Sequence, residues 1–211
     1  MKGRPMDWFN VLGRHGISVM PHMIAKGEDD CARCAGKLGY PVVIKVISPD
    51  VIHKTEFGGV KLNIHNECDA RLAVRAIREN MRKFRKHVDG FLVQKQAGKG
   101  VELIVGGSRD DQFGQLIVFG LGGVFVEVYK DISVRVCPIT EQDAWEMITE
   151  IKAHPVLQGV RGGKPVNEKK LIELLMKTSK LLVELNPKEM DLNPVIADEK
   201  GYAVVDVRVI Q

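Results

Sequence analysis

The chain has 211 residues, of which 45% are hydrophobic and 27% are charged. These values are close to the globular average and exclude wholesale disorder. No apolar run approaches the roughly 18 residues that a membrane span needs, and residues 1–10 lack the apolar core of a secretory signal, so we expect a cytoplasmic protein that does not contact a membrane. The net charge of +4 arises from scattered basic residues, which argues against a nucleic-acid partner.

The spacing of apolar residues, with breaks at Gly, Pro and Asp, predicts helices and short strands in alternation. The helices carry apolar residues along one face, and the strands are rich in β-branched residues. In chain order we predict a helix at 28–38, strands at 41–47 and 59–64, a helix at 67–86, and strands at 91–96, 101–105, 115–119 and 124–128. A helix to residue 151 follows Thr140, which we predict as its N-cap, and it is followed by a helix at 168–185 and strands at 193–197 and 203–209.

This order of elements predicts an α/β or α+β protein with mixed sheets. A helix-rich half gives way to a strand-rich half near Phe91, which predicts a boundary there. The four cysteines, at positions 31, 34, 68 and 137, are too few for a disulfide scaffold in a chain of this length. Cys31 and Cys34 form a CxxC pair without the second ligand pair that zinc needs, so we interpret them as ordinary half-buried thiols.

Two segments in the first half carry candidate polar groups. Lys45 ends an apolar strand, where a lysine either extends to solvent or points at an anion; the residue alone favours solvent. The loop 48–60 contains His53, Lys54 and the pair Gly58-Gly59. Backbone N–H groups of a Gly turn can close over phosphates, although a polar hairpin loop has the same composition. His53 is either a nucleophile or general base, or a surface residue.

A third candidate group lies near the C-terminus. Asp191 and Asn193 alternate to one face of an extended segment, and Asp206 lies in the next apolar strand. Carboxylate and amide oxygens on adjacent strands suit Mg²⁺, which takes waters and phosphate oxygens as its other ligands. An acid within an apolar strand is costly unless it has a partner. The segment therefore indicates either a magnesium site or a structural pair.

Together these segments resemble the beta subunit of the ADP-forming acetyl-CoA synthetases, in the NDP-forming acyl-CoA synthetase superfamily of ATP-grasp proteins. The resemblance covers nearly the whole chain from about Leu38, and its segments occur in family order: 39–46, 48–60, 100–106, 119–127 and 191–195. It implies an ATP-grasp fold with two α/β subdomains, 1–90 and 91–211, that grip the nucleotide between mixed sheets.

The resemblance implies the reaction acyl-CoA + ADP + phosphate ⇌ carboxylate + CoA + ATP, catalysed by an acid–thiol ligase through phosphohistidine intermediates. It implies the cofactors ATP/ADP and Mg²⁺. It also implies a separate alpha subunit that carries the CoA-binding domain and a phosphorylatable histidine, in an alpha2beta2 heterotetramer.

Residue roles follow from the same resemblance, position by position. Lys45, Lys54, Gly58 and Gly59 would contact nucleotide phosphates. The hinge 93–97 would meet adenine through Gln94, Gln96 and Ala97, and Glu102 would hold the ribose hydroxyls. Asn193 and Asp206 would bind Mg²⁺. The catalytic residues would be His53, as a second phosphorylatable histidine, Asp191, which would orient the phosphorylated imidazole, and Glu127, a weaker candidate for the same site.

Two other functions fit the same residues. The chain could belong to another nucleotide-forming CoA ligase such as succinyl-CoA synthetase, which is not expected to carry a histidine in the phosphate loop. It could also be a nucleotide-binding regulatory subunit without catalysis, although all the expected polar positions are filled.

Overall fold

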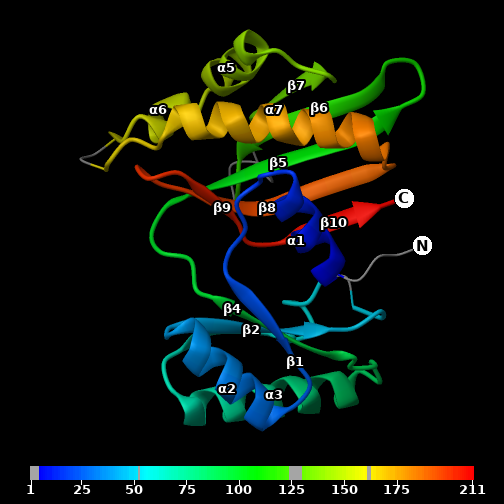
Figure 1. Cartoon of the computed structure of the whole chain (residues 1–211), viewed down its shortest axis with the longest axis vertical. Coiled ribbons are helices and arrows are strands. Elements are labelled where there is room, and N and C mark those ends of the chain that lie inside the picture. The colour runs from blue at the N-terminus through cyan, green and yellow to red at the C-terminus, as the bar shows by residue number, and fades with distance from the viewer. Residues whose placement is uncertain (1–4, 52, 124–129, 161–162) are drawn as a thin grey trace. The chain divides into compact units, whose positions relative to one another are not determined.

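The structure, a computed structural model, describes the chain except residues 1–4, 52, 124–129 and 161–162. Its internal contacts divide the chain into two units (Figure 1). The smaller unit is formed by residues 20–96, and the larger by residues 1–19 together with 97–211. Each unit has its own sheet, and each contributes part of the expected set of site residues.

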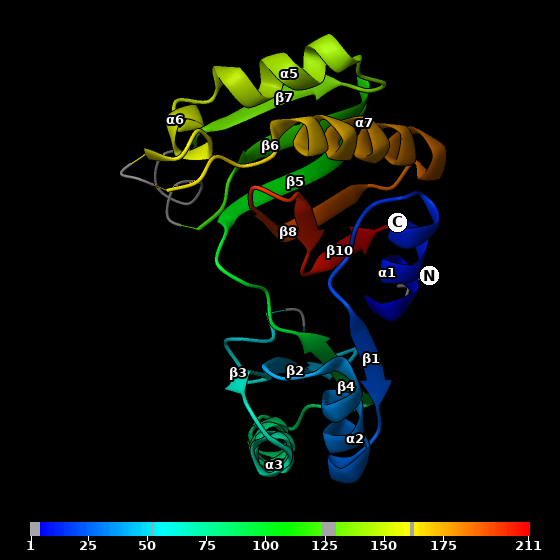
Figure 2. The same cartoon turned by 60° about the vertical axis from the view of Figure 1, so that its left-hand side comes forward.

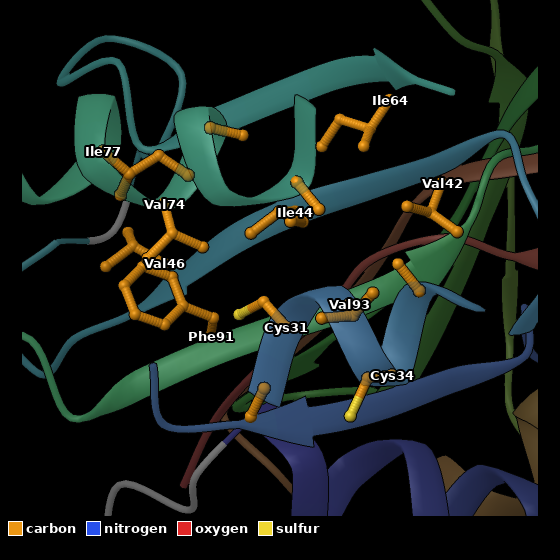
Figure 3. Packing of buried hydrophobic residues seen from close by; sticks show 14 of the residues in the cluster. Cys31, Cys34, Val42, Ile44, Val46, Ile64, Val74, Ile77, Phe91 and Val93 are labelled. Carbon is orange, nitrogen blue, oxygen red and sulfur yellow. The ribbon is translucent and has the colours of Figure 1, made fainter. Parts of the chain in front are cut away.

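The smaller unit is a four-stranded antiparallel sheet with two helices. The strand order is β1 (His22–Ala25), β4 (Gly90–Lys95), β2 (Val42–Ile47), β3 (Val60–Ile64). Helices α2 (Glu28–Leu38) and α3 (Glu67–Lys83) pack on one face of it. Figure 3 shows Val42, Ile44 and Val46 of β2 among the side chains of these helices and of β4. The buried apolar surface between sheet and helices holds this unit together.

The larger unit is built on a six-stranded antiparallel sheet. The order is β10 (Val207–Ile210), β8 (Glu189–Ala197), β5 (Val101–Asp110), β6 (Gly114–Leu121), β7 (Ile132–Val136), and β9 (Tyr202–Val204) pairs with β8. Helices α5 (Glu141–Glu150) and α7 (Glu168–Leu185) cover one face of this sheet, and the short α6 (His154–Leu157) follows α5 (Figure 2). We call the face away from α5 and α7 the distal face.

The N-terminal residues pack with the larger unit. Helix α1 (Pro5–Arg14) buries Trp8, Phe9 and Leu12 and contacts β10. The segment that follows is tied to the same unit, because Lys177 Nζ donates to the carbonyl of Gly16 at 2.8 Å. The chain therefore begins in the larger unit, passes through the smaller one, and returns.

Most predicted elements are confirmed. Helices α2 and α7 have the predicted bounds, α3 and α5 end one to three residues earlier than predicted, and six of the strands occur at predicted positions, several of them extended. The predicted strand 124–128 lies outside the described residues. Four described elements were not predicted from the pattern: α1, β1, β7 and α6.

Three predictions differ from the structure in detail. The sheets are antiparallel in every described strand pair instead of mixed, with one parallel bridge between Val19 and Val204. The predicted strand 203–209 is two strands, interrupted at residues 205–206. The contact units differ from the expected ranges 1–90 and 91–211, because β4 pairs with β1 and β2 and residues 1–19 pack with the larger unit. No described helix is long and apolar enough to span a membrane.

Candidate functional site

Lys45 lies on the face of the smaller sheet opposite the helices. Its neighbours in β2, Ile44 and Val46, belong to the core under α2 and α3, and strand alternation points Lys45 the other way. Lys45 is only 6% exposed, and Gln94, two residues along β4 from the register partner of Lys45, is fully buried on the same face. Burying an ammonium group is costly unless it meets a polar or anionic partner. The position suits a lysine that faces a phosphate.

The loop 48–59 is closed by its own backbone. Gly59 N–H donates to the carbonyl of Lys54 at 2.7 Å, and Gly58 N–H donates to that of Thr55 at 2.9 Å. Gly58 has φ 63°, and the Asn80 amide donates to its carbonyl at 3.2 Å. A Cβ at Gly58 would collide with the Asn80 side chain. In this conformation the glycine pair shapes the turn, and both of its N–H groups are used within the loop.

His53 begins this turn and is exposed, whereas Lys54 is half-buried. The far side of the loop is held by α3 and the residues after it, because Phe57 packs edge-to-face on Phe84 at 5.2 Å. The turn therefore presents His53 to solvent from a well-packed base. Among the residues that the structure describes, no hydrogen bond or ion pair holds the His53 imidazole.

The expected hinge 93–97 contains the division between the two units, which falls between Gln96 and Ala97. Gln96 is fixed by two hydrogen bonds to Asn63, from its Nε2 to Oδ1 and from the Asn63 N–H to its Oε1, both 2.7 Å. Lys95 Nζ donates to the carbonyls of Gly39 and Tyr40 at 2.9 and 2.8 Å. These bonds anchor the end of β4 at the point where the chain leaves the smaller unit.

Glu102 lies on β5 with an exposed side chain, on the distal face. Gly122 N–H donates to its carbonyl at 2.7 Å, and a Cβ at Gly122 would lie 3.2 Å from the Glu102 backbone and Cβ. Gly123 has φ 64°. Gly122 and Gly123, in the Gly-rich run 119–123, therefore allow the chain after β6 to pass close to Glu102. Glu127, further along, lies outside the described residues.

Asn193 and Asp206 lie side by side in the larger unit, although they are 13 residues apart in sequence. The Asn193 N–H donates to the backbone carbonyl of Asp206 at 3.2 Å. The expectation that Asp206 lies within a strand is wrong: it is in the break between β9 and β10, and its Oδ1 accepts the Val207 N–H at 3.2 Å. The break arises because Val205 N–H turns to the carbonyl of Pro194 at 2.9 Å.

Asp191 lies on β8 between Gly106 of β5 and Arg208 of β10. A Cβ at Gly107 would collide with Leu182 of α7, so Gly107 and its partner Met190 face the helices and Asp191 faces away, on the distal face. Burial raises the pKa of Asp191, and the charge of Glu189 adds to this, while Arg208 and a side-chain hydrogen bond with Asn193 oppose it. Gly106 leaves space beside the carboxylate, since a Cβ there would lie 3.9 Å from Asp191 Oδ1.

The expected residues thus form two sets, one in each unit. The smaller unit holds Lys45, His53, Lys54, Gly58, Gly59, Gln94 and Gln96, and the larger holds Ala97, Glu102, Asp191, Asn193 and Asp206. The sequence interpretation did not name Arg208, which lies opposite Asp191 in the register of β10 and β8. Among the described residues no cluster of three His, Cys, Asp or Glu side chains forms a metal site, and Cys31 and Cys34 are buried free thiols.

Two comparisons with known proteins identify the class. A family model described as an ATP-grasp domain matches residues 4–210. The structure of acetyl-coenzyme A synthetase 1 from Ca. Korarchaeum cryptofilum, in complex with coenzyme A, Ca-AMPCP and HgCl+, matches with a TM-score of 0.93 and 45% identity over 96% of this chain and 90% of that one. The fold is that of an ATP-grasp domain.

A further structure of that synthetase contains coenzyme A and Mg-AMPPCP, with its phosphohistidine segment pointing towards the nucleotide binding site; it matches with a TM-score of 0.86 and 42% identity over 98% of this chain and 91% of that one. The beta subunit of ADP-forming acetate–CoA ligase I from Pyrococcus furiosus is 46% identical over 203 residues, which span 95% of this chain and 88% of that subunit. An ADP-forming acetate–CoA ligase from Archaeoglobus fulgidus is 49% identical over 204 residues, or 95% of this chain and 30% of that protein.

The chain belongs to the ATP-grasp family of ADP-forming acetate–CoA ligase beta subunits. This confirms both the resemblance and the fold class expected from the sequence.

Proposed function

We propose that the chain is the nucleotide-binding catalytic subunit of an ADP-forming acetate–CoA ligase, which converts acyl-CoA, ADP and phosphate into carboxylate, CoA and ATP. The observation that carries this proposal is the arrangement of Asp191, Asn193 and Asp206 within one small area of the larger unit. An amide, a metal-binding carboxylate and a second carboxylate in this arrangement suit phosphoryl transfer to or from an imidazole.

Several of the expected residues would hold the nucleotide. Lys45 provides a buried positive charge for a phosphate group, and Lys54 provides a second. Glu102, exposed on β5, would accept hydrogen bonds from the ribose hydroxyls. Gln94, Gln96 and Ala97, at the end of β4 and just beyond it, would contact adenine. Phosphate contacts from the N–H groups of Gly58 and Gly59 would need the turn to open, because both are bonded within it.

Asn193 and Asp206 fit a magnesium ion. They offer one neutral and one anionic oxygen from adjacent backbone positions, which is a typical protein contribution when phosphate oxygens and waters complete the coordination. When bound there, Mg²⁺ would neutralise charge on the phosphate oxygens. The protein side chains then hold the phosphates in line for transfer.

His53 would carry the phosphoryl group between the nucleotide and the partner subunit. It is exposed at the start of a turn whose base is packed against α3, so it can receive a group without disturbing the core. A neutral imidazole attacks phosphorus without first losing a proton. Asp191 would accept a hydrogen bond from the ring of the phosphorylated histidine and orient it, as carboxylates do for catalytic histidines. Glu127 is a second candidate for this role.

A partner follows from the relatives. One similar protein is named a beta subunit, and another has the matching region as 30% of a longer chain. We propose that a separate alpha subunit supplies the CoA-binding domain and its own phosphorylatable histidine, in an alpha2beta2 assembly in the cytoplasm.

The test is co-expression of the chain with a candidate alpha subunit, followed by an assay of phosphate- and ADP-dependent CoA release from acetyl-CoA and succinyl-CoA. We expect the pair to release CoA, and the chain alone to bind Mg·ADP without turnover. If the pair prefers succinyl-CoA, the chain would instead be a subunit of a succinyl-CoA synthetase. Nucleotide binding by a pair that turns over neither substrate would support a regulatory subunit instead.

A further inference from the structure

Arg208 is the basic residue of the distal face that lies beside the proposed transfer site. In the register of β10 and β8 it pairs with Asp191, so both side chains are on the same face. The pair Asn193 and Asp206 is one alternation further along the two strands. Residues two apart on a strand are separated by about 7 Å, which is close to the length of a phosphoryl group with its hydrogen-bond partners. We call each such cross-strand pair a row, so Arg208 and Asp191 form the row next to that of the proposed magnesium ligands.

The guanidinium of Arg208 is exposed and keeps its donors available. Across the part of the chain that the structure describes, it forms no hydrogen bond and no direct ion pair, and it acts on Asp191 only through its charge. A structural arginine in the same unit looks different. Arg135 donates to both oxygens of Glu150 at 2.8 Å from Nη1 and Nη2. Arg208 lies next to the Asp191 carboxylate but forms no bidentate pair with it. The planar N–H donors of its guanidinium are therefore left for a ligand.

We propose that Arg208 binds the transferring phosphoryl group, an inference that rests on the proposed function. In the direction of ATP cleavage, the bond between the γ-phosphorus and the β–γ bridging oxygen breaks, a P–N bond to the histidine imidazole forms, and ADP leaves. The three equatorial phosphoryl oxygens carry negative charge throughout. Arg208 holds one or two of them while the group passes from the Asn193–Asp206 row to the Asp191 row.

A purely structural role makes a different prediction. If Arg208 only offset the charges of Asp191 and Glu189, its removal would alter stability and would act equally on all nucleotides. A ligand for the transferring group must instead distinguish nucleotides with a γ-phosphate from those without one, and this distinction must persist when Asp191 is neutral.

The first experiment measures binding of Mg·ADP and Mg·AMPPCP to the full-length chain by calorimetry. Arg208→Gln should weaken binding of AMPPCP on the order of 10- to 100-fold, the usual size of a charge-assisted contact, and should change ADP binding less than about 3-fold. Arg208→Lys should give an intermediate loss, because lysine keeps the charge but not the planar donors. In an Asp191→Asn background the selective loss should remain. The matched control is Arg109→Gln, on β5 of the same sheet but alternating to the opposite face.

The second experiment measures CoA release by the assembled enzyme with the alpha subunit. Arg208→Gln should lower kcat at saturating ADP, and Arg109→Gln should not. Equal effects of Arg208→Gln on ADP and AMPPCP binding, or a wild-type kcat, would overturn the assignment while leaving the proposed function standing. A wild-type pair that binds no nucleotide or releases no CoA would overturn both.

Discussion

Replacement of Asp206 by Asn separates metal binding from folding. The substitution removes one negative charge but keeps an oxygen that can accept the Val207 N–H, which is 3.2 Å from Oδ1. The bond from the Asn193 N–H goes to the backbone carbonyl of Asp206 and is unaffected by the side chain. No apolar packing is removed. The free energy of unfolding should therefore stay within about 0.5 kcal/mol of the wild-type value.

The effect on catalysis should be much larger. A bound Mg²⁺ contributes several kcal/mol to stabilising a phosphoryl-transfer transition state, and Asp206 provides the anionic one of its two proposed protein ligands. Weakening that site by about 3 kcal/mol corresponds to a loss of about 10²-fold in kcat/KM, since each 1.4 kcal/mol is a factor of ten. The loss should be smaller at high Mg²⁺ concentration, because mass action refills a weakened site.

The assay is ADP-dependent CoA release by the assembled enzyme as a function of Mg²⁺ concentration, together with chemical denaturation of each variant. Asp110→Asn is the matched control. Asp110 Oδ1 also accepts backbone N–H groups, from Gln112 and Phe113 at 2.8 and 2.9 Å, but in the hairpin between β5 and β6. If Asp206→Asn shows the Mg²⁺ dependence of the wild type, the metal assignment is wrong. A large loss of stability would show that the carboxylate is structural.

Three further predictions concern packing, thiols and acid stability. Gly106→Ala should destabilise the chain by about 1–3 kcal/mol in chemical denaturation and impair CoA release, because the new Cβ would lie 2.9 Å from the Met190 carbonyl and would displace the strand that carries Asp191. Cys68 should react rapidly with a thiol reagent, whereas Cys31 should not without denaturant, because burial raises its pKa to about 12; equal rates would contradict this. The Thr140 N–H donates to the Asp143 carboxylate and lowers the pKa of Asp143 in the folded state. The ionised carboxylate therefore stabilises the fold above its unfolded-state pKa, and this stabilisation is lost as the pH falls through the folded-state pKa. Asp143→Asn should therefore cost more stability at pH 7 than at pH 3, and a cost independent of pH would refute the capping role.

The elements that the sequence predicted best are those with local signals. Helix α7 has a long apolar stripe and ends at Leu185, with Asn186 as its C-cap, which has φ 46° and precedes Pro187. Thr140 was predicted as an N-cap, and its side chain accepts the Asp143 N–H at 3.2 Å in a reciprocal capping box. Caps and periodicity depend on neighbouring residues, so the sequence alone is sufficient to predict them.

The missed elements have weaker or shorter signals. Strand β1 has four residues and owes its conformation to pairing with β4, which lies some 70 positions later in the chain. Strand β7, with the sequence Ile-Ser-Val-Arg-Val, does alternate apolar and polar residues, so a signal was present although the strand was not predicted. The break at residues 205–206 depends on bonds to Pro194 and Asn193, which no local pattern specifies.

In the candidate site, too, some features follow from local motifs and others depend on the tertiary fold. Motifs indicated Asp191, Asn193 and Asp206 as one group, and the structure brings these three together. The position of Arg208 opposite Asp191 was not predictable, because it depends on the register of two strands, and a shift by one residue would place it on the other face. The sequence suggested that the Gly58-Gly59 pair closes over phosphates. The hydrogen bonds that the two N–H groups form depend, however, on the fold of the whole loop.

The most direct test of the account is the location of phosphate during turnover. The enzyme assembled with its alpha subunit is incubated with ATP radiolabelled at the γ-phosphate, and the two chains are separated under basic conditions. We expect acid-labile, base-stable label on this chain at His53. In His53→Ala that label should be absent, turnover should fall on the order of 10³-fold, and the free energy of unfolding should change by less than about 0.5 kcal/mol. Label only on the alpha subunit, with His53→Ala near the wild-type rate, would contradict the account.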